Sequence, residues 1–90
     1  MPTVTLEFPN KSRSFDEVRN AVRFIGHDGM FEVPFFVETA ALAQPGRTQL
    51  SEADLLTAFD AARNSIHDVA REAYSHGRRT SYVLTAVDFR

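Results

Sequence analysis

The stretch that decides the fold runs from Ser51 to His76 and reads SEADLLTAFDAARNSIHDVAREAYSH. Its apolar residues recur in steps of four and three, at positions 55, 59, 62, 66, 69 and 73, which is the spacing of one face of an α-helix. Ser51 and Asp54 form a helix-capping pattern. We therefore predict one amphipathic helix from Glu52 to His76, about 37 Å long at 1.5 Å per residue. In so small a domain this helix is expected to kink or project, and Gly77 is expected to close it in a left-handed conformation.

Three segments ahead of this helix are predicted to be β-strands. Alternation of polar and apolar residues from Thr3 to Phe8 is typical of a half-buried strand. Strands are also predicted from Ala21 to Ile25 and from Met30 to Val37, joined by a tight hairpin at Asp28-Gly29. Val22 and Phe24 should share a face with alternate residues of the next strand, at positions 31, 33, 35 and 37. Pro34 has no amide hydrogen, so that strand is expected at an edge or bulged there.

The remaining segments are less regular. Ser14 and Glu17 fit a capping box, so one helical turn ending near Asn20 is predicted, although the apolar spacing from Phe15 to Val22 leaves a longer helix open. A short helix is predicted from residue 38 to 43, before Pro45-Gly46, and a last strand from residue 81 to 89. Together these elements predict an α+β fold: a four-stranded antiparallel sheet, the long helix across one face, and one or two short helices.

The composition indicates an ordinary globular domain and excludes several kinds of functional site. The chain has 90 residues, 43% hydrophobic and 24% charged, enough for one domain. It has no cysteine, which excludes disulfides, thiolate metal sites and cysteine nucleophiles. Its net charge of −2 argues against a general nucleic-acid or anionic-membrane binder. With no signal-peptide pattern and no stretch near the ~20 apolar residues of a membrane span, a cytoplasmic protein is expected, with no membrane partner.

Several phrases taken in order resemble a known family. They are LEFPN at residues 6–10, AVRFIGHDG at 21–29, Val37-Glu38, and YVLTAVDF at 82–89. This ordered set is similar to the bacterial domain-of-unknown-function family 1488 and covers nearly the whole chain, departing most at residues 44–50. The resemblance implies a small α+β domain that stands alone as a short protein. It implies no activity, cofactor or catalytic residue.

Residues with catalytic or metal-binding chemistry are few and scattered. His67 and His76 are nine residues apart on the predicted helix and therefore point to opposite sides of it, so they cannot share a metal ion. His27 belongs to the predicted hairpin turn, and all three histidines are expected to be exposed polar residues. Asp68 and Glu72 are the clearest carboxylate pair, on what is expected to be a solvated helix face. We therefore predict no catalytic residue, no metal and no cofactor, and not an enzyme.

Two features bear on nucleic-acid binding. Gly26-x-x-Gly29 superficially resembles the glycine loop of KH domains, but it joins two predicted strands and contains an aspartate, which favours a turn. Possible nucleic-acid contacts are the basic residues around the end of the long helix, together with one on a strand: Arg71, Arg78, Arg79 and Arg23. The favoured role of the pair that follows the helix is to complement the negative end of the helix dipole, so nucleic acid is not the expected partner.

The eight phenylalanines carry the leading hypothesis on function. One helix covers one face of a sheet, so the other face must be covered by short helices, by a loop, or by a second copy. We expect a non-catalytic interaction or regulatory module that self-associates through a sheet edge or an apolar face, with a homo-oligomer or another protein as partner. The alternatives are a weak nucleic-acid binder that uses the four arginines, and an enzyme on a small metabolite in which His27 or His67 faces a pocket.

Overall fold

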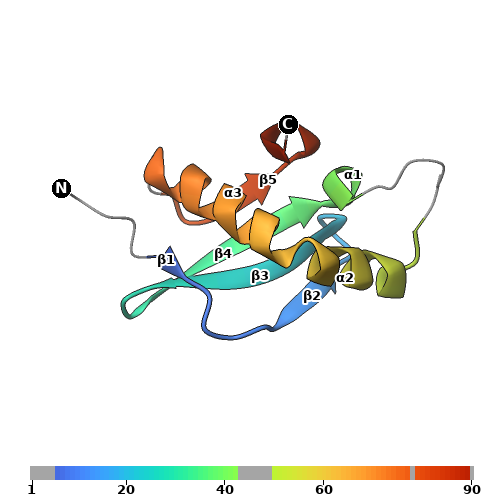
Figure 1. Cartoon of the computed structure of the whole chain (residues 1–90), viewed down its shortest axis with the longest axis horizontal. Coiled ribbons are helices and arrows are strands. Elements are labelled where there is room, and N and C mark those ends of the chain that lie inside the picture. Colours follow the sequence, from blue (N-terminus) through green and yellow to red (C-terminus); the bar gives the residue numbers. More distant parts are fainter. Residues whose placement is uncertain (1–5, 43–49, 78, 90) are drawn as a thin grey trace.

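The computed structural model describes residues 6–42, 50–77 and 79–89. One five-stranded sheet lies beneath the helices (Figure 1). In chain order the elements are β1 (Leu6–Glu7), β2 (Arg13–Asp16), β3 (Ala21–Asp28), β4 (Phe31–Glu38), α1 (Thr39–Leu42), α2 (Glu52–Ala61), α3 (Arg63–Ser75), β5 (Tyr82–Leu84) and the 3-10 helix η1 (Ala86–Phe89). The predicted α+β class is confirmed, and so is the short helix after β4. The part of the predicted first strand before Leu6 lies outside the described residues.

The centre of the sheet is the antiparallel hairpin β3–β4. Val22 pairs with Val37 and Phe24 with Phe35, so the predicted shared face is confirmed. On the far side of β3 lie β1 and β2, both antiparallel to it. On the far side of β4 lies β5, which runs parallel to it. The sheet is therefore mixed, because the chain passes through all three α-helices between β4 and β5, and such a long crossover permits a parallel pair.

The hairpin turn falls one residue later than predicted. Its two central residues are Gly29 and Met30, because Asp28 still pairs with Phe31. Gly29 has a φ of 61°, and it is the one glycine with positive φ among the described residues. Glycine in the first central position is typical of a type II′ turn, whose twist suits a two-residue hairpin. β3 is consequently longer than predicted, whereas β4 keeps its predicted length and begins and ends one residue later.

The predicted edge position of Pro34 is only partly correct. β4 lies between β3 and β5 and is not an edge strand. Pairing with β5, however, begins at Phe35. Pro34 therefore lies immediately before that pairing starts, where its missing amide hydrogen costs no bond to β5.

Two predictions of local structure are wrong. The segment from Ser14 is not a helical turn: β2 pairs with β3, with Phe15 opposite Val22. Asp16 at its end accepts from the Arg19 amide instead, and Asn20, with a φ of 52°, closes the turn into β3. Pairing with β3 therefore prevails over a local capping pattern.

The last strand is also shorter than predicted. It ends at Leu84, and η1 follows in place of the strand that was expected to reach residue 89. The Asp88 side chain accepts from the Thr85 amide at 2.7 Å, and the Asp88 amide donates to the Thr85 carbonyl at 3.0 Å. These two bonds close a helical turn where the β-branched composition indicated a strand.

The long helix forms where it was predicted, but it is broken. Ser51 caps α2, with the reciprocal Asp54 bond in place, as expected. Ala62 leaves the helical conformation with φ −106° and ψ 14°, which divides the predicted helix into α2 and α3. The predicted left-handed closure at Gly77 is wrong, because Gly77 has no positive φ and the right-handed His76 ends α3. A kink was expected at one end and instead lies near the middle.

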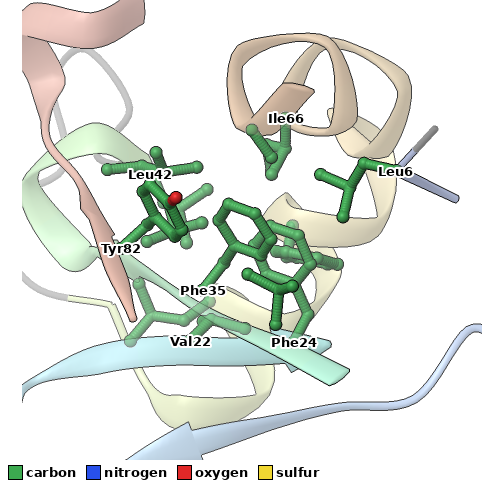
Figure 2. Close-up of a cluster of buried hydrophobic side chains, with 13 residues drawn as sticks. Leu6, Val22, Phe24, Phe35, Leu42, Ile66 and Tyr82 are labelled. Carbon is green, nitrogen blue, oxygen red and sulfur yellow. The ribbon is translucent and has the colours of Figure 1, made fainter. Parts of the chain in front are cut away.

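The core fills the space between the helices and one face of the sheet (Figure 2). Phe24 stacks on Phe35 with ring centroids 5.2 Å apart, and Phe59 of α2 lies equally close to Phe24. Ile66 of α3 is fully buried, which confirms the predicted apolar stripe. Phe31 is 74% exposed, whereas the other seven phenylalanines are buried or partly buried. Most of the phenylalanines are therefore covered within one chain, so their number does not by itself require a second copy.

Candidate functional site

The sheet face turned away from the helices, here called the helix-free face, has an apolar centre. Its apolar side chains are Ala21 and Ile25 on β3, Pro34 and Phe36 on β4, and Val83 on β5. Phe36 is only 6% exposed although it lies outside the core cluster, and the Arg19 guanidinium lies 4.3 Å from its ring centroid. Val83, beside it in register, is 49% exposed. None of the helices in the described ranges contributes to the cover of this face.

Charges of opposite sign flank that centre on adjacent strands. β3 carries Arg23 and His27 on the helix-free face, whereas β4 carries Glu32 and Glu38. In register, His27 pairs with Glu32 at one end of the apolar centre, and Glu38 lies at the other end. The face therefore has a column of basic side chains beside an acidic one, with Glu7 of β1 and Asp16 of β2 on the other side of the basic column.

The edges of the sheet are poorly suited to adding another strand. β5 has three residues and β2 has four, and short edge strands offer few unpaired backbone groups. Pro34 further reduces the donors on the part of β4 that extends beyond β5. Of the two routes to self-association that the sequence suggested, the face is favoured over the edge.

The three histidines lie apart from one another. His67 is not the exposed residue that was predicted: its ring stacks on Phe8 at 3.9 Å with an interplanar angle of 8°. Burial, and then the positive charges of Arg63 and Arg71, lower the pKa of His67 to about 4. His27 lies on β3, and His76 follows α3 with Nε2 3.7 Å from a Glu72 carboxylate oxygen. Within the described ranges no three metal-ligating side chains come together.

The structure does not assemble the four arginines suggested as nucleic-acid contacts. Arg23 lies on the helix-free face, whereas Arg71 lies on α3, on the opposite side of the sheet. Arg79 is exposed after α3, and its amide donates to the Tyr82 hydroxyl at 2.9 Å. That hydroxyl donates in turn to the Gly77 carbonyl at 2.6 Å, near the end of the helix. Arg78 lies outside the described residues.

Basic residues that the sequence reasoning missed lie around Arg71. Arg63 and Arg71 occupy positions four residues before and after His67 on α3. Arg13 of β2 binds Asp60 through two nitrogens, at 3.0 and 2.8 Å, and Arg63 binds the same carboxylate at 2.6 Å. These bonds hold the pKa of Asp60 below its usual value, with the Arg13 hydrogen bond as the largest cause. The spacing of 63, 67 and 71 was the signal available in the sequence.

With both surfaces described, the comparison with known families becomes informative. Residues 6–85 match the family model described as Protein of unknown function (DUF1488). The chain belongs to this family. No curated protein and no solved structure matches it. Since the DUF1488 description assigns no activity, the function has to be argued from the surfaces themselves.

This DUF1488 chain also has an open groove between α3 and the segment of β5 and η1. Its lining includes Ala73, His76 and Asp88, with Glu72 and Arg79 near its ends, and one part of it holds about 210 Å³. The side chains of His76 and Glu72 are 75% and 77% exposed. Acid–base chemistry needs groups held in a partly dry setting, and these two are solvated. Glu72 thus lies on a solvated helix face, as predicted.

The KH-like glycine pattern of this DUF1488 chain does not form a loop. Gly26 is buried within β3, and only Gly29 belongs to the turn. A Cβ atom at Gly26 would lie 2.9 Å from side-chain atoms of both Leu6 and Phe8. Close packing therefore accounts for this glycine. Separately, none of the helices in the described part of the chain is long and apolar enough to cross a membrane.

Proposed function

We propose that this DUF1488 protein is a non-catalytic interaction module that pairs with a second copy of itself through the helix-free face. The observation that carries the proposal is the apolar centre around Phe36 and Val83, which no described helix covers. Val83 is half exposed, and Phe36 is screened from water by the side chain of Arg19. A second apolar surface packed on this centre would bury further apolar area, which stabilises the complex by roughly 25 cal/mol per Å² of area removed from water.

The charge pattern favours a second copy as the occupant. Sheets that pack face to face lie about 10 Å apart with their strands within about 30° of each other. A twofold axis that runs along the strands, between β3 and β4, lays each β3 over the partner's β4. His27 then faces Glu32 of the partner subunit, and Arg23 faces Phe36 of the partner subunit, two residues from the partner's Glu38. Each basic column meets an acidic column twice, so the face complements itself.

Opposite charge swaps test this arrangement directly. Native mass spectrometry at micromolar concentration should show wild-type dimers of twice the 10.1 kDa chain mass. Arg23→Glu and Glu38→Arg should each reduce the dimer fraction, because each brings like charges together at positions 23 and 38, which lie two residues apart along the facing strands. An equimolar mixture of the two variants should recover dimers, now of mixed composition. Glu72→Arg, which makes the same charge change on exposed α3, is the matched control and should dimerise like wild type.

The possible results of these measurements distinguish the proposed dimer from its alternatives. Recovery only in the mixture requires that the two columns face each other across a twofold axis. A wild-type chain that remains monomeric up to high micromolar concentration would overturn self-association. Equal losses in Glu38→Arg and Glu72→Arg would place any dimer contact elsewhere.

A further inference from the structure

A second surface lies on the helix side of the sheet, where α3 meets the chain that connects β1 to β2. We call it the basic stripe: Arg63, His67 and Arg71 of α3, with Lys11 and Arg13 beside them. Residues four apart on a helix lie on one face, about 6 Å apart at 1.5 Å per residue. The Arg63 guanidinium donates to the Lys11 carbonyl at 3.2 Å, and Arg71 Nε donates to the Leu6 carbonyl at 3.2 Å. These bonds hold both ends of the row against the β1–β2 chain.

Aromatic rings support the side chains of the stripe. His67 stacks on Phe8, and the Arg71 guanidinium lies 5.1 Å from the centroid of the same ring. Arg63 lies 5.0 Å from the centroid of Phe59. The imidazole therefore lies flat on a phenyl ring with a guanidinium one turn away on either side. With its pKa lowered to about 4, the imidazole is uncharged at neutral pH.

The stripe is locally positive in a chain whose net charge is −2. Three cations, those of Arg13, Arg63 and Arg71, adjoin two carboxylates, Asp60 and Asp68, which leaves one positive charge. The ion pair between Arg71 and Asp68 is weak, because its N–O distance is 3.5 Å and water screens the largely exposed Asp68 carboxylate. The chain therefore has a locally basic region although its net charge is negative.

We propose that the basic stripe binds single-stranded nucleic acid. One base stacks on the part of the His67 imidazole that solvent reaches, while Arg71, whose side chain is 43% exposed, binds a phosphate beside that nucleotide. Base stacking on aromatic side chains combined with arginine–phosphate contacts is the general chemistry of single-strand binding. A duplex does not offer an unstacked base, which is why the single strand is favoured. The proposal goes beyond self-association and uses the opposite side of the sheet, so each can fail without the other.

The test measures fluorescence anisotropy of a labelled oligothymidine at low salt. Arg71→Gln and His67→Ala should each weaken binding by about 10-fold, in line with the stacking energy of one base. For Arg71→Gln the slope of log affinity against log salt should also fall by about 0.7, the value for one lost phosphate contact on a single strand. Arg23→Gln, the same charge change on the helix-free face, is the matched control and should bind like wild type. A duplex of equal length should bind about 10-fold more weakly.

Three outcomes would overturn the proposal: no binding at low salt, equal weakening in Arg23→Gln and Arg71→Gln, or a duplex that binds as tightly as the single strand. Arg71 also holds Leu6, so each variant is first checked for cooperative unfolding. If Arg71→Gln does not fold, wild-type protein decides the question by NMR. The His67 and Phe8 ring resonances should then shift when oligothymidine is added, and unchanged rings would contradict the proposal.

Discussion

Phe35 and Phe36 are neighbours in β4, yet they are buried in different ways. Phe35 is 0% exposed beneath the helices, where it stacks against Phe24 and Tyr82. Phe36 is 6% exposed on the helix-free face, where the guanidinium of Arg19 lies over its ring. Low exposure therefore arises in one case from interlocked secondary-structure elements and in the other partly from a long side chain. The second kind of cover is easily displaced, since a side chain moves without disturbing the fold.

The two faces also differ in the residues that surround these rings. Around Phe35 every neighbouring strand position is apolar, including Val22 and Leu84 on the adjoining strands. Around Phe36 the adjoining strands carry Arg23 on one side and Val83 on the other. A face meant for permanent burial within one chain does not need charge, whereas a face that meets a partner uses charge to choose it. The contrast thus supports an interface on the helix-free side.

Truncating each phenylalanine to alanine should separate the two kinds of burial. Phe35→Ala should lower the free energy of unfolding by about 3–5 kcal/mol, since it opens a cavity in the core. Small domains hold about 5–15 kcal/mol in total, so this variant should be close to unfolded. Phe36→Ala should cost only about 1–2 kcal/mol, mainly the burial of the ring on the sheet surface and its cation–π contact with Arg19. Urea unfolding followed by circular dichroism measures both.

These measurements need two protein concentrations, because a dimer raises apparent stability by mass action. If Phe36 belongs to the dimer contact, the cost of Phe36→Ala should grow as protein concentration rises, while that of Phe35→Ala should not. Equal costs at both positions and at every concentration would remove the distinction between the two faces.

The elements predicted well from sequence are those whose pattern and tertiary role agree. The apolar stripe of α2 and α3 and the alternation in β3 and β4 are repeated over many residues, so local signal and core packing point the same way. The Ser51 cap was predicted for the same reason, since it precedes the stripe. By contrast, Ser14 belongs to a short segment with a capping pattern, and pairing of β2 with β3 outweighed it.

The structural features that the sequence did not predict depend on contacts between residues that are distant in the sequence. No glycine or proline marks the helix break at Ala62, which lies between Asp60 and Arg63, and Asp60 accepts from both Arg13 and Arg63. The parallel pairing of β5 follows from where the crossover returns, not from the composition of the strand. The burial of His67 requires Phe8, 59 residues earlier, to lie against α3. The basic stripe shares that origin, and only its spacing along α3 is local.

A glycine substitution sharpens the comparison on the helix-covered face. Gly26→Ala adds a Cβ atom within 2.9 Å of Leu6 and Phe8 and 3.2 Å of Phe35. Such overpacking should lower the free energy of unfolding by about 1–3 kcal/mol, measured by urea titration. Gly77→Ala is the matched control, because nothing lies within 4 Å of its added atom. It should be neutral or slightly stabilising, and an equal loss at both glycines would contradict the close packing of β3 beneath Phe8.

The smallest of these effects concerns acid sensitivity on the helix side. Burial against Phe8, then the charges of Arg63 and Arg71, lower the pKa of His67 to about 4 in the folded protein, against about 6.5 in an unfolded chain. Between these values the unfolded state binds more protons, so acid favours unfolding. The contribution of the neutral His67 imidazole to the free energy of unfolding is fully present above about pH 6.5 and is lost as the pH falls toward 4. The loss should be about 1–2 kcal/mol, because water still reaches part of the ring.

His67→Phe isolates this contribution, since a phenyl ring also stacks on Phe8 but does not titrate. Urea unfolding at intervals from pH 7.5 to pH 4.5 should show a smaller fall in stability for His67→Phe than for wild type. The same series on His76→Phe, at an exposed position that does not stack on Phe8, should retain the wild-type fall. If wild type and His67→Phe lose stability in parallel, the imidazole is not held neutral by its surroundings. The uncharged stacking surface inferred for the basic stripe would then lose its physical basis, whereas the argument for the helix-free face would be unaffected.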